Sequence, residues 1–467
     1  MNRYSQRLCV FASLVFLLLF LLPLTSVQAE TTDRTGPPQV LLLYDSKGIG
    51  TANEGGLAAL ERLLAAYGVS VTRRSLDAYE PGMLNHYTRV IHVANLPELQ
   101  LQTDNPAYET DAKGYRGSML EIGGPPAARG AEADAGTEAD VTRLAGLPLD
   151  PASVLAAGET LREWLGIERR GETYLLFKEV YPFSDLELLK KLADRLYDSG
   201  TPFLVSVRPV FTNTDFPAMQ RYLDALAYVQ SRNGSILVNV PVVMPSINSQ
   251  DHSLGPKMEQ FTLLLEREGI IPLGVGAEMY WTYDAHYAGP GLQYFDSAVL
   301  FPDEKPMPMQ PVDVSAAFRS SLYSITPDEL DELPGGGDKL LEFPMDTAVT
   351  LDFVQDESQL DAVLERIHSY WLDYADYKQS AHEVRAGGRT AGSSAGLLYL
   401  DGEPQNPGYV SKVPDKDFAY EAEVQKSFAH LFKAQNQFFI IVIAVSLVVF
   451  GGLMIIGYRL YRKKYLK

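Results

Sequence analysis

The sequence is almost free of cysteine: Cys9 is the only one among 467 residues. It lies in an N-terminal segment where basic residues precede an apolar run, Leu8 to Leu24, and a small-x-small end at Val27-Gln28-Ala29. This is the pattern of a secretory signal peptide, so we expect residues 1–29 to be cleaved off; the alternative is an uncleaved anchor. A mature chain without a thiol can form no disulfide, and its stability must come from its core.

Basic residues are scarce as well. The chain has 59 Asp and Glu against 40 Lys and Arg, and seven of these cations lie in the first 29 or the last nine residues, where there is no acid. The region between therefore has 59 acids against 33 bases, a net charge near −26. Such a surface repels nucleic acid and anionic lipid headgroups. We expect no nucleic-acid partner, and a neutral or cationic partner such as partly de-acetylated polysaccharide.

Motifs for metals and nucleotides are also few. Asp284-x-His286 offers two ligands without a third in view, and a glycine pair, Gly48-x-Gly50, has Asn53 where a dinucleotide fingerprint needs its third glycine. We therefore predict no metal ion and no cofactor. Four further histidines stand alone, and we interpret them as surface or capped residues: His252, His368, His382 and His430.

One long apolar run lies near the C-terminus, from Phe438 to Tyr458, and a cluster of cations follows it in residues 459–467. The run is long enough to cross the hydrocarbon core of a bilayer. The cations predict a cytoplasmic tail by the positive-inside rule. We therefore expect a single-pass cell-membrane protein with an extracytoplasmic ectodomain.

Residues 37–122 have the pattern of a flavodoxin-like α/β domain. The apolar strand Gln39–Tyr44 precedes a tight turn and an amphipathic helix that begins at Asn53 and ends at Gly68. Two more strands follow, over 69–73 and Arg89–Ala94. Strands alternating with helices predict a parallel sheet. Residues 123–168 are rich in Ala, Gly, Pro and acidic residues, and their composition predicts a linker.

A second series of strands and helices occupies residues 170–376, at about 30 residues per unit. This spacing suits a (β/α) barrel or a related doubly wound sheet. The predicted strands are 174–180, 203–209, 235–241, 272–277 and 348–353, and the helices are 185–199, 216–233, 254–268 and 357–374. Gly200, Gly234 and Gly269 each follow a helix as stop signals. Residues 377–437 are interpreted as a juxtamembrane loop and helix.

The segment from Lys178-Glu179-Val180 through Tyr181-Pro182-Phe183-Ser184-Asp185-Leu186 to the strand end Ser206-Val207-Arg208-Pro209-Val210 resembles the start of the polysaccharide deacetylase domain. It is most similar to an uncharacterised bacterial envelope branch whose first strand ends in Asp-Asp-Val. The resemblance is good over about 170–280, weak over 37–100 and absent elsewhere. It implies a deacetylase-like (β/α) barrel and a role in envelope or exopolysaccharide assembly.

The chain departs from that family where the metal would bind. The family's Asp-Asp pair falls on Lys178-Glu179, and its His-x-x-x-His pair falls on residues 239–243, which begin at Asn239. A metal-dependent deacetylase needs the cation to polarise the acetyl carbonyl and to lower the pKa of its bound water. The resemblance therefore implies the fold without its catalysis.

Charged residues at predicted strand ends are the first candidates for a site. Lys178 and Glu179 end the first strand of the second series, and Glu278 ends the fourth. Glu179 with Glu278 could form the carboxylate pair of a glycosidase, or the ammonium of Lys178 could fill the vacant cation position. The alternative is an ion pair that only stabilises the fold, with Glu278 as a partner for Lys178.

Aromatic and polar residues follow Glu278 directly. Such a mixture suits a carbohydrate cleft, because the apolar faces of sugar rings stack on indole and phenol rings; the alternative is a structural aromatic loop. With Lys178 and Asn239, the carbohydrate-binding candidates in this segment are Tyr280, Trp281, Tyr283, Asp284 and His286.

Three functions remain open at this level. We favour a catalytically inactive, membrane-anchored, deacetylase-like protein that binds polysaccharide or an envelope-assembly protein. The second is an active carbohydrate hydrolase or esterase that uses Glu179 and Glu278. The third is a purely structural interaction module that docks through the flavodoxin-like domain.

Overall fold

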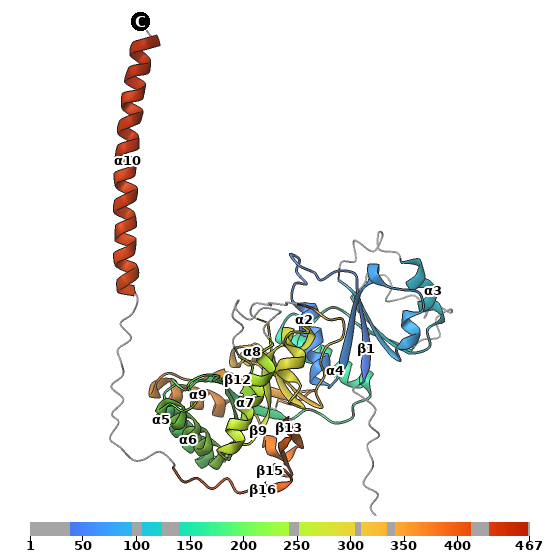
Figure 1. Cartoon of the computed structure of the whole chain (residues 1–467). Helices are drawn as coiled ribbons and strands as arrows, with labels where there is room; N and C mark the ends of the chain where they lie inside the picture. The colour runs from blue at the N-terminus through green and yellow to red at the C-terminus, as the bar shows by residue number, and fades with distance from the viewer. Residues whose placement is uncertain are drawn as a thin grey trace, which may run out of the picture. The chain divides into compact units, whose positions relative to one another are not determined.

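A computed structural model describes residues 38–95, 105–123, 140–241, 252–303, 310–333, 341–411 and 429–465. The chain divides into two compact units, Met1–Lys412 and Val413–Lys467. The first contains an open sheet, a barrel and a small antiparallel sheet, and the second contains one long helix (Figure 1). The predicted signal peptide lies outside the described residues.

The N-terminal sheet is parallel, with its five described strands in the order β2-β1-β3-β4-β5. This is the flavodoxin-like order, with neighbours on both sides of the first strand. The predicted fold of this region is confirmed, and β1 and β3 begin and end at the predicted residues. The strands are β1 (Gln39–Tyr44), β2 (Ser70–Ser75), β3 (Arg89–Ala94), β4 (Ser118–Gly123) and β5 (Asp140–Leu144).

Helices pack on both faces of this sheet. Helices α2 (Gly56–Ala66) and α4 (Pro151–Leu165) bury their leucines against one face. The short helices η1 (Leu76–Ala78) and η2 (Met83–His86) pack on the other face, beside α3 (Pro106–Gly114). Because both faces are covered, the central strand β1 is a continuous apolar run, and Val40 to Leu43 are fully buried.

The linker prediction for residues 123–168 is corrected by the structure. Residues 124–139 lie outside the described residues, but β5 forms an edge of the sheet and α4 packs on α2. Helix α4 has a capping box between Asp150 and Ser153 and ends at Gly166 in the left-handed conformation. Its small residues allow close packing: a Cβ at Gly158 would lie 2.9 Å from Pro344 Cγ. The small residues that predicted a linker are therefore the ones that let α4 pack tightly.

The second series forms a closed barrel of parallel strands in the order β10-β11-β12-β6-β7-β8-β9, within the described part of the chain. The predicted barrel is confirmed. Its strands are β6 (Thr173–Val180), β7 (Phe203–Val207), β8 (Gly234–Asn239), β9 (Pro272–Glu278), β10 (Ser297–Phe301), β11 (Ser320–Ile325) and β12 (Thr347–Asp352). The sequence analysis missed β10 and β11, because Pro-rich stretches surround these two short apolar runs.

Amphipathic helices pack outside the barrel. They are α5 (Leu186–Asp198), α6 (Pro217–Ser231), α7 (Leu254–Arg267), α8 (Pro327–Asp331) and α9 (Glu357–Ser369). Gly200 and Gly269 take the left-handed conformation after α5 and α7, as expected. After α6, however, Asn233 takes that conformation and Gly234 begins β8. Gly234 is required there because a Cβ would lie 2.5 Å from Val229 Cγ1.

Residues 377–405 are not a loop, which corrects the prediction for the start of 377–437. After η7 (Tyr377–Gln379) they form an antiparallel sheet of four strands among the described residues. The strands are β13 (His382–Ala386), β14 (Arg389–Ser394), β15 (Leu397–Leu400) and β16 (Glu403–Gln405). The sequence analysis missed these strands because each is too short to show a clear period-two alternation of apolar and polar residues, and because turn residues dominate the composition.

This segment packs on the amino ends of barrel strands. The Lys378 ammonium donates to the carbonyl of Asn233, just before β8, and the His382 ring bonds to Ser297 Oγ at the start of β10 (2.8 Å). His382 also stacks on Tyr377 at a centroid distance of 3.7 Å, and burial lowers its pKa to about 4. His382 is thus a core residue and not the expected surface residue, and the segment covers the amino end of the barrel.

The C-terminal unit contains α10 (Ala429–Tyr465). Its stretch Val442–Arg459 has the length and hydropathy of a membrane span, and its described side chains are exposed. This overlaps the predicted transmembrane segment, Phe438 to Tyr458. Length and composition therefore agree with the expected anchor.

Glu266, on α7, provides a test of the barrel's packing. Its side chain is fully buried, neither carboxylate oxygen has a hydrogen-bond partner among the described residues, and Arg389 Nε lies 3.8 Å away. Burial raises its pKa to about 7, so the folded protein favours the protonated, neutral carboxyl group. The contribution of this group to stability is full below pH about 4.5 and is lost as the pH rises through 7 and the group ionises. We expect Glu266→Gln to unfold like the parent at pH 4.5, and to be more stable by at most about 3 kcal/mol at pH 8.5.

Urea denaturation at the two pH values measures this difference. The matched control is Glu365→Gln, which changes an exposed glutamate on α9. It should show no pH-dependent difference from the parent. Equal stability of Glu266→Gln and the parent at pH 8.5 would show that other interactions offset the cost of burying the negative charge of Glu266.

Candidate functional site

The carboxyl end of the barrel is the end left open by the antiparallel sheet, and α/β barrels place their active sites at this end. The strand-end residues singled out in the sequence lie here. They gather around Arg208, a buried residue directly after β7 that the sequence analysis did not select.

Glu179 has an unusual backbone at the end of β6. Its φ is 66°, in the left-handed region that costs a residue with a Cβ about 1–2 kcal/mol. The β6–β7 register shifts between Phe177 and Val180, so Glu179 lies in a bulge. Bulges redirect side chains and are frequent beside active sites. Here the bulge brings the Glu179 carboxylate to Arg208, whose Nη2 donates to its Oε1 at 2.6 Å.

Arg208 connects three strand ends. Besides its ion pair with Glu179, it donates from Nη1 to the carbonyl of Val240, directly after β8. Its backbone N–H donates to the carbonyl of Val180 at 3.0 Å. The guanidinium therefore holds together the carboxyl ends of β6, β7 and β8. Its sequence signal was a lone cation between the largely apolar strand β7 and Pro209, because an arginine at such a position is rarely buried unless it is paired.

Lys178 has other partners than those expected. Its ammonium lies 3.2 Å from Asp352 Oδ1, at the paired position of β12, and 5.8 Å from the ring centroid of Phe301. Glu278 was the expected carboxylate partner, and the structure replaces it with Asp352. Lys178 is therefore a rim ion pair between β6 and β12.

Glu278 lies at the end of β9, in the electrostatic field of the same cluster. Burial raises its pKa; Arg208 lowers it, and Asp303 and Glu179 raise it further. The charges of Glu179 and Arg208 therefore both act on Glu278. A carboxyl whose pKa is raised by burial holds its proton longer, as a general acid must.

Asn239 completes the cluster from β8. It is buried, directly precedes Val240, and pairs in register with Gly276 of β9. Its Oδ1 and the Oγ of Ser206 on β7 have no hydrogen-bond partner among the described residues. The barrel mouth therefore contains buried polar atoms available to a water molecule or a ligand.

The aromatic segment after β9 folds inward. Trp281 in η5 (Met279–Tyr283) is 0% exposed and packs on Tyr287 at a centroid distance of 4.7 Å. A Cβ at Gly291, in η6 (Ala288–Leu292), would lie 2.6 Å from the indole. Tyr280 is also buried. The expected sugar stacking on Trp281 needs an exposed ring face, and this ring has none.

The remaining residues of this segment have structural partners. Asp284 is buried, and its carboxylate accepts from the backbone N–H groups of His286 (2.9 Å) and Gln310 (2.7 Å). The Tyr283 hydroxyl donates to Asp303, and its ring lies under the guanidinium of Arg73. Asp284 thus fixes a loop, and the described residues contain no group of three or more His, Cys, Asp or Glu that could hold a metal ion.

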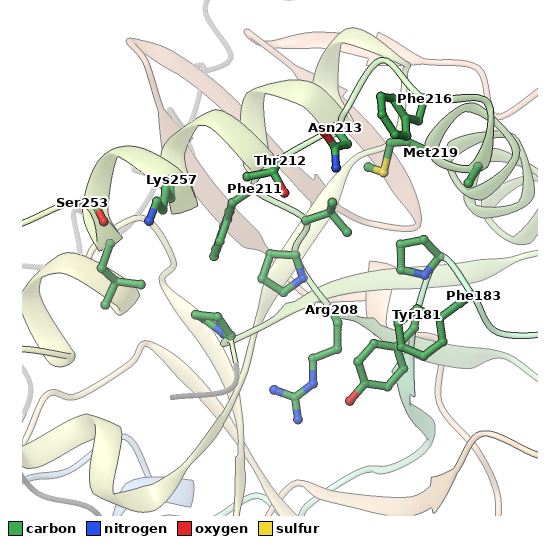
Figure 2. Close-up of a pocket in the computed structure, with 16 residues that line it drawn as sticks. Tyr181, Phe183, Arg208, Phe211, Thr212, Asn213, Phe216, Met219, Ser253 and Lys257 are labelled. Carbon is green, nitrogen blue, oxygen red and sulfur yellow. The ribbon is translucent and has the colours of Figure 1, made fainter. Parts of the chain in front are cut away.

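Exposed aromatic residues lie elsewhere at the same end of the barrel. They surround a cavity of about 590 Å³ between the loops after β6 and β7 and the start of α7. Phe183 and Phe216 are 79% and 53% exposed, and the Tyr181 and Phe183 rings stack at 4.7 Å. Figure 2 shows Phe183 and Phe216 on one side of the cavity, and Phe211 and Lys257 on the other.

Arg208 is part of the lining of this cavity, so the cavity adjoins the polar cluster. The other lining residues are mainly apolar, including Pro182, Met219 and Leu254. The sequence analysis quoted the Tyr-Pro-Phe run and used it only as evidence of resemblance. The available sequence signal was the presence of aromatic residues directly after a predicted barrel strand.

One motif escaped the sequence analysis. Residues 392–396 read Gly-Ser-Ser-Ala-Gly, the Gly-x-Ser-x-Gly pattern of serine hydrolases, with Ser394 as the nucleophile. In those enzymes the serine lies on a turn between a strand and a helix. Here the run forms the turn of the β14–β15 hairpin, where Ala395 and Gly396 have positive φ. The small residues of this run therefore serve a hairpin turn, which requires positive φ angles.

Comparisons with known proteins do not assign the chain to a family. No protein-family model matches the chain, and no curated protein is similar to it. What the structure shows is the fold, a parallel sheet followed by a parallel barrel, with a polar cluster and an aromatic-lined cavity at the carboxyl end.

The Glu179–Arg208 pair gives the second testable prediction. Glu179→Gln leaves the buried guanidinium with a neutral partner, and we expect a loss of about 1–2 kcal/mol in the free energy of unfolding, discounted because the Glu179 side chain is 37% exposed. The matched control is Glu187→Gln, which removes an exposed ion pair with Lys190 and should cost at most about 0.5 kcal/mol. Urea denaturation at pH 7 measures both, and equal values would show that the pair does not stabilise the mouth.

Proposed function

We propose that this chain is a membrane-anchored extracytoplasmic protein whose deacetylase-like barrel binds polysaccharide, without metal-dependent deacetylation, in assembly of the cell envelope or of exopolysaccharide. The observation that carries the proposal is the group of exposed aromatic rings around the cavity at the barrel mouth. Exposed aromatic residues at a concave site are expected to serve binding, because leaving them in water stabilises nothing.

Several features support polysaccharide as the ligand. Sugar rings present C–H faces that pack on aromatic rings, and Phe183, Tyr181 and Phe216 offer such surfaces. Arg208 and Asn213 supply hydrogen-bond donors to hydroxyl groups at the cavity. A long chain can also remain bound at an open site through several weak contacts.

The proposal of an inactive site rests on the chemistry of the side chains. The position of the family's metal-binding aspartates holds Lys178 and Glu179, and each is paired with an oppositely charged neighbour. The first position of the family's histidine pair holds Asn239, whose amide is a poor ligand for zinc. These residue types offer no set of three protein ligands to a catalytic metal.

The location and the role in assembly rest on sequence features. The predicted signal peptide and the basic tail favour an ectodomain outside the membrane, and the apolar stretch of α10 suits a single span. The barrel is compatible with the deacetylase-like fold, and the assembly role follows from that resemblance alone.

One observation favours a second function, a carbohydrate hydrolase or esterase. Burial raises the pKa of Glu278 and Glu179 is paired with Arg208, so the barrel mouth contains two carboxyl groups in different environments. Paired carboxyl groups with unequal proton affinities are the machinery of glycoside hydrolysis.

Removal of an exposed ring tests the proposed binding. We expect Phe183→Ala to weaken glycan binding by the full-length protein in detergent about tenfold, because each aromatic stacking contact contributes on the order of 1 kcal/mol. The control is Trp371→Ala, which removes a ring that is 67% exposed and does not line the cavity. Binding is measured on an oligosaccharide array and by calorimetry. Absence of glycan binding by the parent would overturn the proposal and leave a protein partner as the cavity's ligand.

The hydrolase alternative makes a different prediction. If Glu278 is a general acid, Glu278→Gln abolishes release of reducing ends or acyl groups from polysaccharide while leaving binding within about twofold. In the parent, activity should fall as the pH rises through the raised pKa of Glu278, because the acid is then ionised. Product release is followed by mass spectrometry over pH 4–9. A parent that binds glycan without product at any pH excludes this function.

A further inference from the structure

A second cavity adjoins the aromatic-lined one. It has a volume of about 560 Å³ and lies along α7, between the loop after β7 and the turn that joins β13 to β14. Val210, Phe211 and Lys257 line both cavities, so these three side chains form the boundary between them. Each cavity has the size of a small-molecule site, and together they form a longer groove than a single sugar fills.

The second cavity differs from the first in charge. Its lining contains Lys257, Arg267 and Arg389 and no acidic residue. Arg389 pairs with Asp401 at 3.0 Å and lies near Glu266. Lys257 and Arg267 form no ion pair with any residue that the structure describes.

Acidic groups close to this cavity are already engaged. Glu259 on α7 accepts the backbone N–H of Gly387 at 2.9 Å, and Asp401 accepts from Arg389 and from the backbone of Thr390. The carboxyl group of Glu266 is buried beneath the helix. The Glu259 and Asp401 carboxylates keep their negative charges beside the cavity, but every charged side chain in its lining is a cation.

The net charge of the whole ectodomain does not decide the potential here. At physiological ionic strength the Debye length is about 8 Å, so acids on distant surfaces are largely screened. A ligand in the groove interacts with the cations that line it, at hydrogen-bond distance. This local charge revises the expectation of a neutral or cationic ligand drawn from composition.

We infer that the two cavities form one extended binding groove for an acidic polysaccharide. The aromatic cavity packs against sugar rings. Lys257 and Arg267 lie ten residues apart on α7, about 15 Å along the helix axis, so each binds the carboxylate of a different uronic acid unit. This inference rests on the proposed function and adds to it a class of polymer and a minimum length. Charge-assisted hydrogen bonds are about twice as strong as neutral ones, so they select acidic chains over neutral ones.

The test uses an array of bacterial oligosaccharides of two to eight units, each acidic one paired with its carboxyl-reduced, neutral counterpart. The probe is the full-length protein in detergent. We expect the parent to prefer the acidic form of the longer chains by about tenfold, with the preference declining from 50 to 500 mM salt. Chains too short to reach the second cavity should show no preference.

Two variants locate the effect. Lys257→Ala/Arg267→Ala should remove the preference for acidic chains. Arg267→Ala alone, which changes a residue that lines only the second cavity, should reduce that preference while leaving the binding of carboxyl-reduced chains within about twofold. Lys191→Ala, which removes a cation on α5 that lines neither cavity, should bind like the parent. Circular dichroism confirms folding; if the double variant does not fold, Arg267→Ala alone, which changes an exposed residue, replaces it.

The outcomes separate this inference from the proposed function. A parent that binds acidic and carboxyl-reduced chains equally, or a double variant that keeps the preference, overturns the acidic-polymer inference and leaves glycan binding intact. A parent that binds no glycan overturns both. Binding of acidic peptide in place of glycan, lost in the double variant, would assign the groove to a protein partner and also overturn both.

Discussion

Closure of the parallel barrel is the constraint on which the rest of the molecule depends. The pairing of β12 with β6 joins the last strand of the barrel to the first, so every carboxyl end meets at one mouth. A parallel barrel has no free edge, and its two ends become chemically distinct. In this chain the segment around Lys378 and His382 packs on the amino end. The carboxyl end is the end that carries the aromatic-lined cavity.

The mouth is organised around one buried cation. Arg208 holds the ends of β6, β7 and β8 together through Glu179 and two backbone carbonyls. The left-handed backbone at Glu179 is the local cost of bringing its carboxylate to this position. A guanidinium cannot polarise a carbonyl as a metal ion does or generate hydroxide from water.

The N-terminal sheet is attached to the barrel by charged and aromatic contacts. Arg62 on α2 donates to the carbonyl of Ser324 and lies over the Tyr323 ring, and Arg73 on β2 lies over Tyr283 in η5. Tyr283 in turn donates to Asp303, whose charge acts on Glu278. The sheet therefore packs against the barrel mouth on the side of η5. Glu61 is buried in this contact, where its pKa is raised to about 7 by burial.

Sequence patterns by themselves determined the architecture: alternating apolar runs and amphipathic helices indicated the parallel sheet and the barrel, and the uninterrupted run after Phe438 indicated the membrane span. These patterns are local, since a strand or a span needs only its own apolar residues. Local patterns also placed Glu179, Asn239 and Glu278 at strand ends that share one mouth. Tertiary structure alone decided which side chains face solvent there. Trp281 is enclosed by Tyr287 and Gly291, whereas Phe183 projects into water, because exposure depends on how the chain folds around each ring and not on the apolar pattern of the segment. Tertiary structure also decided the role of Arg208: its partners lie at the ends of β6 and β8, which only strand pairing places on either side of β7.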